Sequence, residues 1–303
     1  VAATNGDVTI DDASAGNDAV IGVDSGNFIA NSVSSGNNLS VTLSDGDATI
    51  NSSVTGNDLT VSVDAGDIAI NNTESGNDLS IVANQGNVAI DNAAAVNDLL
   101  LHTGIGNLTV ADASVGNNAV IDVDSGNFIA GSVDVGNDLS LTVTDGDVTI
   151  DEVPAGNDLA MAVDAGNTTI TRAEAGRNLT VAANTGHIDI TDSVAGHDLV
   201  INSTAGNINL ARATAQAGSA VVKTAAGSTD ITDKLTAGTS ARVEATNGIS
   251  VDAVESGDSL LLVNNNGLVN VNSARTLNAG ANIEISNNSG DIRVTSAAAA
   301  SDL

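Results

Sequence analysis

The sequence predicts an all-β fold, a right-handed parallel β-helix (β-solenoid) with about 20 residues per turn and about 15 turns. Three observations predict it. Gly recurs at every tenth position from Gly6 to Gly206, with a single exception at Val96. Between these glycines, apolar and polar residues alternate with the period of two that is typical of strands. The apolar residues are Val, Ile, Leu and Ala, whereas the 303 residues include only two Phe and no Tyr or Trp.

The stretch 56–71, "GNDLTVSVDAGDIAIN", contains the two strands of one predicted turn. Because strand side chains alternate between the two faces, we expect five inward positions: Leu59, Val61, Val63, Ile68 and Ile70. From residue 19 to residue 210, the equivalent positions are all apolar except at Thr103, Thr168 and Ser203. Small residues around 72–75 predict a third, weaker side that closes a triangular coil.

Gly and Asn are expected at the corners because a sharp corner needs a residue with positive φ, which these two residue types tolerate best. Asn follows the corner glycine in many turns, so its side chains are expected to stack along the coil axis and to form hydrogen-bonded ladders. One such column contains Asn17, Asn37, Asn57, Asn77, Asn97, Asn117, Asn137 and Asn157.

A longer repeat predicts the domain organisation. Residues 16–35 match residues 116–135 at 15 of 20 positions, and the following turns align at the same offset of 100. We therefore expect one β-helix over residues 1–303, in which residues 11–110 and 111–210 are duplicated five-turn blocks. Beyond Leu210 the glycine spacing loosens while the alternation persists, so residues 211–303 are expected to form a less regular continuation.

The charge excludes several classes of partner. The chain has 38 Asp and Glu against eight Lys and Arg, a net charge of −30, and all the basic residues lie beyond residue 171. Nucleic acid is excluded as a partner because it requires a basic surface. Membrane insertion is excluded because no apolar run is long enough to span a bilayer. The absence of Cys excludes disulfides and thiol chemistry.

We expect no catalytic site and no cofactor-binding site. Enzymatic β-helices need charged residues clustered on long loops, whereas the corners here are short through residue 210 and the basic residues form no evident group. The three histidines, His102, His187 and His197, are not expected to bind metal because no third ligand converges on them in the sequence. His102 is expected to face outward from a strand.

Calcium is the one possible cofactor. Asp24, Asp45, Asp47, Asp64 and Asp67 fall at the same corner of three consecutive turns. Carboxylates stacked ~4.8 Å apart repel one another unless they are solvated, screened or bridged by a cation such as Ca²⁺. The alternative is that exposed Asp side chains only keep the protein soluble.

Two apolar residues are candidates for lateral contacts. Ile29 and Ile129 are predicted to face outward within a column that otherwise contains mostly Thr and Ala. Exposed isoleucines of this kind favour side-by-side packing of two copies.

The repeat resembles the filamentous haemagglutinin type of secreted exoprotein. The resemblance rests on "GNDLTV…AGDIAIN", "GNDLSI…QGNVAID" and "GRNLTV…TGHIDI", and it extends over residues 5–295. It implies two-partner secretion and an adhesive or filamentous role at the surface of a Gram-negative-like cell. The amino-terminal secretion domain of that family is not recognisable here.

These observations predict a non-enzymatic structural rod, the shaft of a filamentous-haemagglutinin-like adhesin that is secreted to the extracellular space or the bacterial cell surface. The alternative is a subunit of a self-assembling extracellular filament or matrix fibre, with calcium as the candidate stabilising ion. The expected partners are a cell-surface receptor or carbohydrate for the shaft, and other copies of the chain, held laterally or end to end, for the filament.

Overall fold

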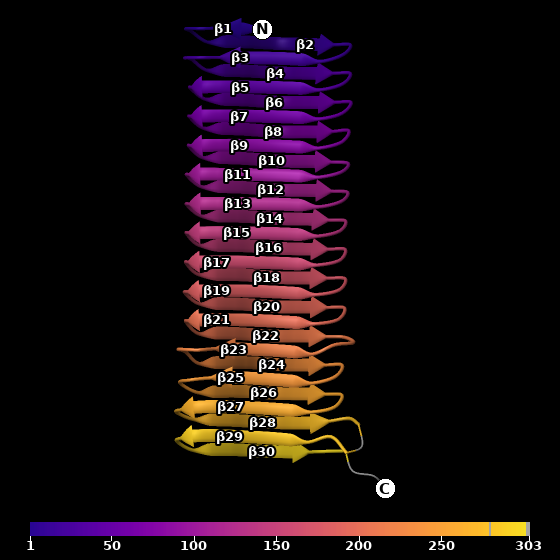
Figure 1. The fold of residues 1–303 in the computed structure, drawn as a ribbon, viewed down its shortest axis with the longest axis vertical. Coiled ribbons are helices and arrows are strands. Elements are labelled where there is room, and N and C mark those ends of the chain that lie inside the picture. The colour runs from indigo at the N-terminus through magenta and orange to yellow at the C-terminus, as the bar shows by residue number, and fades with distance from the viewer. Residues whose placement is uncertain (279, 301–303) are drawn as a thin grey trace. The chain divides into compact units, whose positions relative to one another are not determined.

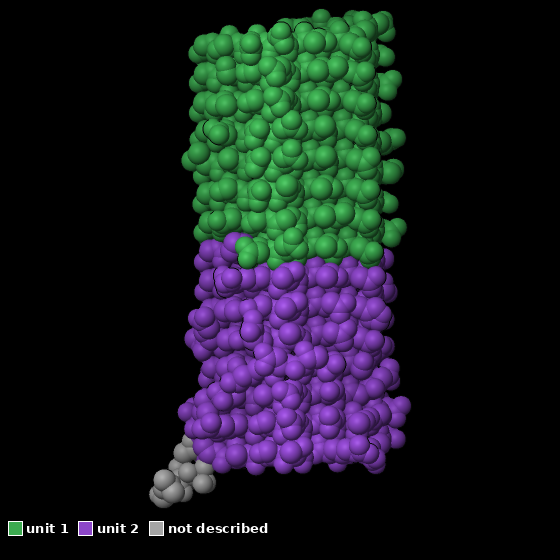
Figure 2. All heavy atoms as spheres, turned by 180° about the vertical axis from the view of Figure 1, so that it is seen from behind, with its two compact units in different colours: residues 1–153 green, residues 154–303 purple. Residues whose placement is uncertain are grey.

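The computed structural model describes residues 1–278 and 280–300 of the chain. It shows an all-β parallel β-solenoid of about 15 turns with roughly 20 residues per turn, and this confirms the predicted fold class. No helix within the described residues has the length and apolar character that a membrane span requires. The chain divides into two compact units, residues 1–153 and residues 154–303 (Figure 2).

Each turn of the first unit contributes one strand to each of two parallel sheets (Figure 1). The odd-numbered strands are β1 (Ala2–Ala3), β3 (Ala19–Val23), β5 (Leu39–Asp45), β7 (Leu59–Ala65), β9 (Leu79–Gln85), β11 (Leu99–Ile105), β13 (Ala119–Ser125) and β15 (Leu139–Asp145). The even-numbered strands are β2 (Val8–Ala15), β4 (Phe28–Ser35), β6 (Ala48–Thr55), β8 (Ile68–Ser75), β10 (Val88–Ala95), β12 (Leu108–Val115), β14 (Phe128–Val135) and β16 (Val148–Ala155). Paired residues lie twenty positions apart, as Leu59 and Leu79 do.

The second unit is built in the same way. Its odd-numbered strands are β17 (Leu159–Ala165), β19 (Leu179–Thr185), β21 (Leu199–Ala205), β23 (Ala220–Thr224), β25 (Ala241–Ala245), β27 (Leu260–Asn266) and β29 (Ile283–Ser289). Its even-numbered strands are β18 (Thr168–Ala175), β20 (Ile188–Ala195), β22 (Ile208–Ala215), β24 (Thr229–Ala237), β26 (Ile249–Ser256), β28 (Val269–Thr276) and β30 (Ile292–Ala298). The pairing of β24 with β26 shifts register between Ile231 and Lys234, so this part of the coil contains an irregularity.

The core is a stack of thin aliphatic layers. All five predicted inward positions of the turn 56–71 are at most 2% exposed. Thr103, Thr168 and Ser203, the three polar residues at such positions, are 0% exposed. Phe28 is also fully buried, and its register partner in β6 is Ala48. The small partner leaves room for the ring, so the volume of the core changes little from turn to turn.

The third side of the coil is the second half of each even-numbered strand. In β8 the inward residues Ile68 and Ile70 are followed by two outward residues, Asn71 and Asn72, and then by a second buried pair, Thr73 and Ser75. Two successive outward residues break the alternation and bend the strand, and the pairing with β10 resumes at Asn72. Each turn therefore has seven inward positions rather than five.

The two corner glycines of a turn are required for different reasons. Gly66 has φ of 142°, a conformation that residues with a Cβ rarely adopt. Gly56, at the other corner, has no positive φ, but an added Cβ there would lie 2.3 Å from the carbonyl oxygen of Gly36 in the preceding turn. The expectation that Asn also takes positive φ is wrong, because no described residue other than Gly has positive φ.

Val96 occupies the second type of corner and is 68% exposed. A side chain can therefore be accommodated where φ is ordinary, once the neighbouring carbonyl shifts.

We expect Gly66→Ala to destabilise the protein by about 1 to 3 kcal/mol more than Gly56→Ala, because only Gly66 adds the cost of an unfavourable φ. Urea unfolding of the two variants measures this difference, and equal midpoints would contradict the distinction between the corners.

Candidate functional site

Two of the predicted calcium ligands belong to a ladder of hydrogen bonds that joins successive turns. The Asp67 backbone N–H donates to the Asp47 carboxylate at 2.9 Å, and the Asn87 backbone N–H donates to the Asp67 carboxylate at 2.6 Å. In the turn before, the Asp47 backbone N–H donates to the Asn27 side-chain oxygen at 2.9 Å. One oxygen of each carboxylate is therefore occupied in holding the corner of the next turn.

The other three predicted ligands are exposed and do not stack directly on one another. Asp45 lies opposite Ala65 in the register of β5 and β7. Asp24 and Asp64 are separated by the intervening turn, which has Ser44 at the equivalent position. The five acids thus occupy three columns, and calcium binding there stays a prediction.

A second ladder lies at the Asn corner, and its geometry differs from the expected stacking of Asn on Asn. The Asn77 side-chain amide donates to the Asp58 carboxylate at 2.7 Å, and the backbone N–H of Asp78 donates to the same oxygen at 3.3 Å. Asn97 repeats the arrangement with Asp78 at 2.8 Å. Each Asn therefore bonds to the residue after the preceding Asn, and the Asp side chains of this corner are structural.

Ile29 and Ile129 face outward as predicted and are 44% and 45% exposed. The register partners of Ile29 are Thr9 and Thr49, and Ile129 lies next to Thr109. Each isoleucine is thus an isolated apolar residue in a Thr column, which is common on protein surfaces. Lateral packing through these residues stays a prediction.

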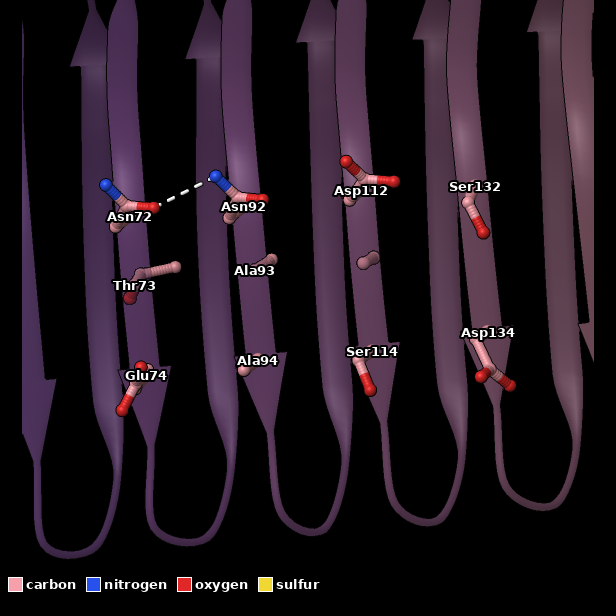
Figure 3. A pocket seen from close by; sticks show the side chains of 11 residues that line it. Asn72, Thr73, Glu74, Asn92, Ala93, Ala94, Asp112, Ser114, Ser132 and Asp134 are labelled. Carbon is pink, nitrogen blue, oxygen red and sulfur yellow. Dashed lines mark hydrogen bonds between the residues drawn. The ribbon is translucent and has the colours of Figure 1, made fainter.

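A shallow polar groove lies on the second halves of β8, β10, β12 and β14 (Figure 3). Asn72 and Asn92 lie along one edge, where the Asn92 amide donates to the Asn72 side-chain oxygen at 2.9 Å. Ala94 leaves space between the larger outward residues, and the groove is lined by three carboxylates, those of Glu74, Asp112 and Asp134. These groups can hydrogen-bond to an uncharged, hydroxyl-rich ligand, whereas an anion would be repelled.

The structure corrects the expectation that no third ligand converges on a histidine. His102 in β11 is the register partner of Asp122 in β13, and its Nδ1 lies 3.4 Å from the Asp122 carboxylate. Asp124 completes a group whose ligand atoms all lie within 4.8 Å of one another. It is the only such group of three or more His, Asp or Glu residues among those that the structure describes. The period of twenty residues, applied to His102, would have identified Asp122.

Six of the eight basic residues are held by acids rather than gathered at one place. Ion pairs among the described residues join Arg172 to Glu174, Arg177 to Asp158, Arg212 to Asp192, Lys223 and Arg242 to Glu244, and Lys234 to Glu255. Arg177 stands in the Asn column and replaces the usual amide donor to the acid of the preceding turn, with its Nε 2.8 Å from Asp158. Hydrogen bonds from Arg177 outweigh partial burial and, with those from Asn178, lower the pKa of Asp158.

A carboxyl group whose pKa is lowered by folding stabilises the protein at pH values above its unfolded pKa and loses this effect as the pH falls through its folded pKa. We therefore expect Arg177→Met to lower the stability by about 1 kcal/mol or less at neutral pH, because the pair is partly exposed. The difference from the wild type should shrink as the pH falls below 3.8, the ordinary pKa of Asp. Thermal melting between pH 7 and pH 2.5 measures it, with the exposed Arg293→Met as a control, and a pH-independent difference would contradict the assignment.

Comparison with known proteins gives one family. A family model described as Toastrack DUF4097 matches the chain over residues 34–165 and 71–255. No curated protein and no solved structure matches the chain. The two matches overlap and together span residues 34–255.

Proposed function

Since the chain belongs to the Toastrack DUF4097 family and forms a β-solenoid structural domain, we propose that it serves as the non-enzymatic shaft of an exported surface adhesin. The observation that carries the proposal is the repetition of one set of bonds from turn to turn. In the first unit, the backbone N–H of Leu59 donates to the backbone carbonyl oxygen of Asp78 at 2.9 Å, and the backbone N–H of Leu79 donates to that of Asp98 at 2.9 Å. Such stacking adds stability with every turn, which suits a protein whose task is to span a distance.

The side chains at the surface support a solvent-exposed shaft. The outward positions hold mainly Asp, Asn, Ser and Thr, and the net charge is −30. Like charges keep copies of the chain apart, and the ladders use part of this charge to hold the corners. The isolated Ile29 and Ile129 give only small apolar areas for a lateral contact, so the shaft is favoured over the self-assembling filament.

The chemistry of the surface also favours certain partners. A receptor or carbohydrate that offers hydroxyl groups suits the amide and carboxylate side chains that line the groove on β8 to β14. An anionic partner does not suit this groove, because its carboxylates would repel it. In this proposal, an adhesin presents the shaft between the cell and such a partner, and the shaft carries out no reaction.

Electron microscopy at two levels tests the proposal. We expect antibodies against the chain to label the outside of intact, unpermeabilised cells that produce it, and we expect the purified chain to appear as separate particles over a wide range of concentrations. Label confined to permeabilised cells would contradict export. Micrometre-long filaments of the purified chain would contradict the shaft and favour the self-assembling fibre.

A further inference from the structure

We propose that His102, Asp122 and Asp124 form a binding site for a divalent transition-metal ion of the Zn²⁺ class. The three side chains come from two neighbouring strands, β11 and β13 (Figure 1). The His102 side chain is 27% exposed and that of Asp122 is 39% exposed, so two ligands are partly enclosed. Their ligand atoms are already close enough for small side-chain rotations to bring them onto one ion.

The donor set indicates which ions fit. Imidazole nitrogen binds Zn²⁺ and similar transition metals, whereas Ca²⁺ and Mg²⁺ prefer oxygen ligands alone. Two carboxylates balance the charge of a divalent ion. Three protein ligands leave one position of a tetrahedral zinc site for water.

The local sequence departs from the repeat at the residues that make this cluster. At an offset of 100 residues, Asn202 replaces His102 and Gly22 replaces Asp122. Gly104, two residues after His102, stands where the turns on either side have Asn84 and Asp124. The preceding turn therefore places no side chain beside Asp124. The two unusual ligands therefore meet on adjacent turns at the junction of the duplicated blocks, where the ion would join one turn to the next.

The surroundings of the cluster also differ from those of an ordinary acidic corner. Leu100 and Val120 are register partners on the same outward face, and they are 40% and 46% exposed. Apolar side chains at one edge of the cluster reduce the access of water to the ligands and strengthen the attraction between the carboxylates and a cation.

Titration calorimetry of the full chain without an affinity tag tests the proposal, with ZnCl₂ as the probe. The titration is carried out in excess calcium and physiological salt, which occupy or screen the other acidic side chains. We expect one Zn²⁺ ion per chain, and we expect His102→Asn and Asp124→Asn each to weaken binding by at least about tenfold. Both substitutions introduce a residue type that the repeat already uses at outward positions, so the variants should fold, and circular dichroism checks this.

The matched control is His197→Asn. His197 is 58% exposed and lies 3.0 Å from Asp198 but belongs to no group of three ligands among the described residues. Its substitution should leave the affinity unchanged. Cobalt in place of zinc gives a second measurement, because ligation by His102 produces visible absorption bands that His102→Asn abolishes. No saturable Zn²⁺ binding, or binding that is insensitive to His102→Asn, would overturn the proposal.

Discussion

The constraint on which the structure depends is the placement of each residue directly against its equivalent twenty positions away. Parallel strands lie ~4.8 Å apart, so successive corners must pass each other at that distance. At Gly66 an added Cβ would lie 2.2 Å from the carbonyl oxygen of Gly46. The glycine repeat is therefore the consequence of close stacking at both corners, and the need for positive φ applies to only one of them.

The same constraint governs the charges. Equivalent Asp residues would face each other if every turn had them, and the chain avoids this repulsion in two ways. In the column of Asp47 and Asp67, each carboxylate accepts the backbone N–H of the next turn. At the other corner, amides or Arg177 supply donors to the acids of the preceding turn. An acidic surface thereby contributes to the cohesion of the coil as well as to its solubility.

The fold could be predicted from the sequence because the apolar positions repeat with only three polar exceptions, Thr103, Thr168 and Ser203. Leu59, Val61 and Ile68, for example, are apolar in the sequence and buried in the core layer of their turn. The inward direction of Thr73 and Ser75 was not predicted, because the bend at Asn71 and Asn72 shifts the alternation and small polar residues give no apolar signal. Ser75 can be buried because its hydroxyl lies 2.7 Å from the carbonyl oxygen of Asn57 and 2.6 Å from that of Asp78, and it can donate to either.

The candidate site was harder to predict than the fold. Acids that are neighbours along the chain, such as Asp45 and Asp47, belong to different columns, so their spacing in sequence suggested a cluster that the register does not form. His102 and Asp122 are distant in sequence and adjacent in space. Side-chain clusters in a solenoid are found by adding the length of a turn, and a search for ligands among near neighbours in sequence misses them.

The register itself is the central claim, and the absence of Cys makes it directly measurable. Nitroxide labels can be attached to cysteines that replace Ala89 and Thr109, exposed register partners in β10 and β12. In-register parallel stacking predicts strong dipolar broadening of the electron paramagnetic resonance spectrum for this pair. Labels at 49 and 109, three turns or ~14 Å apart, should show much weaker broadening. Equal spectra for the two pairs would contradict a twenty-residue turn and with it the whole account of the corners, the ladders and the site.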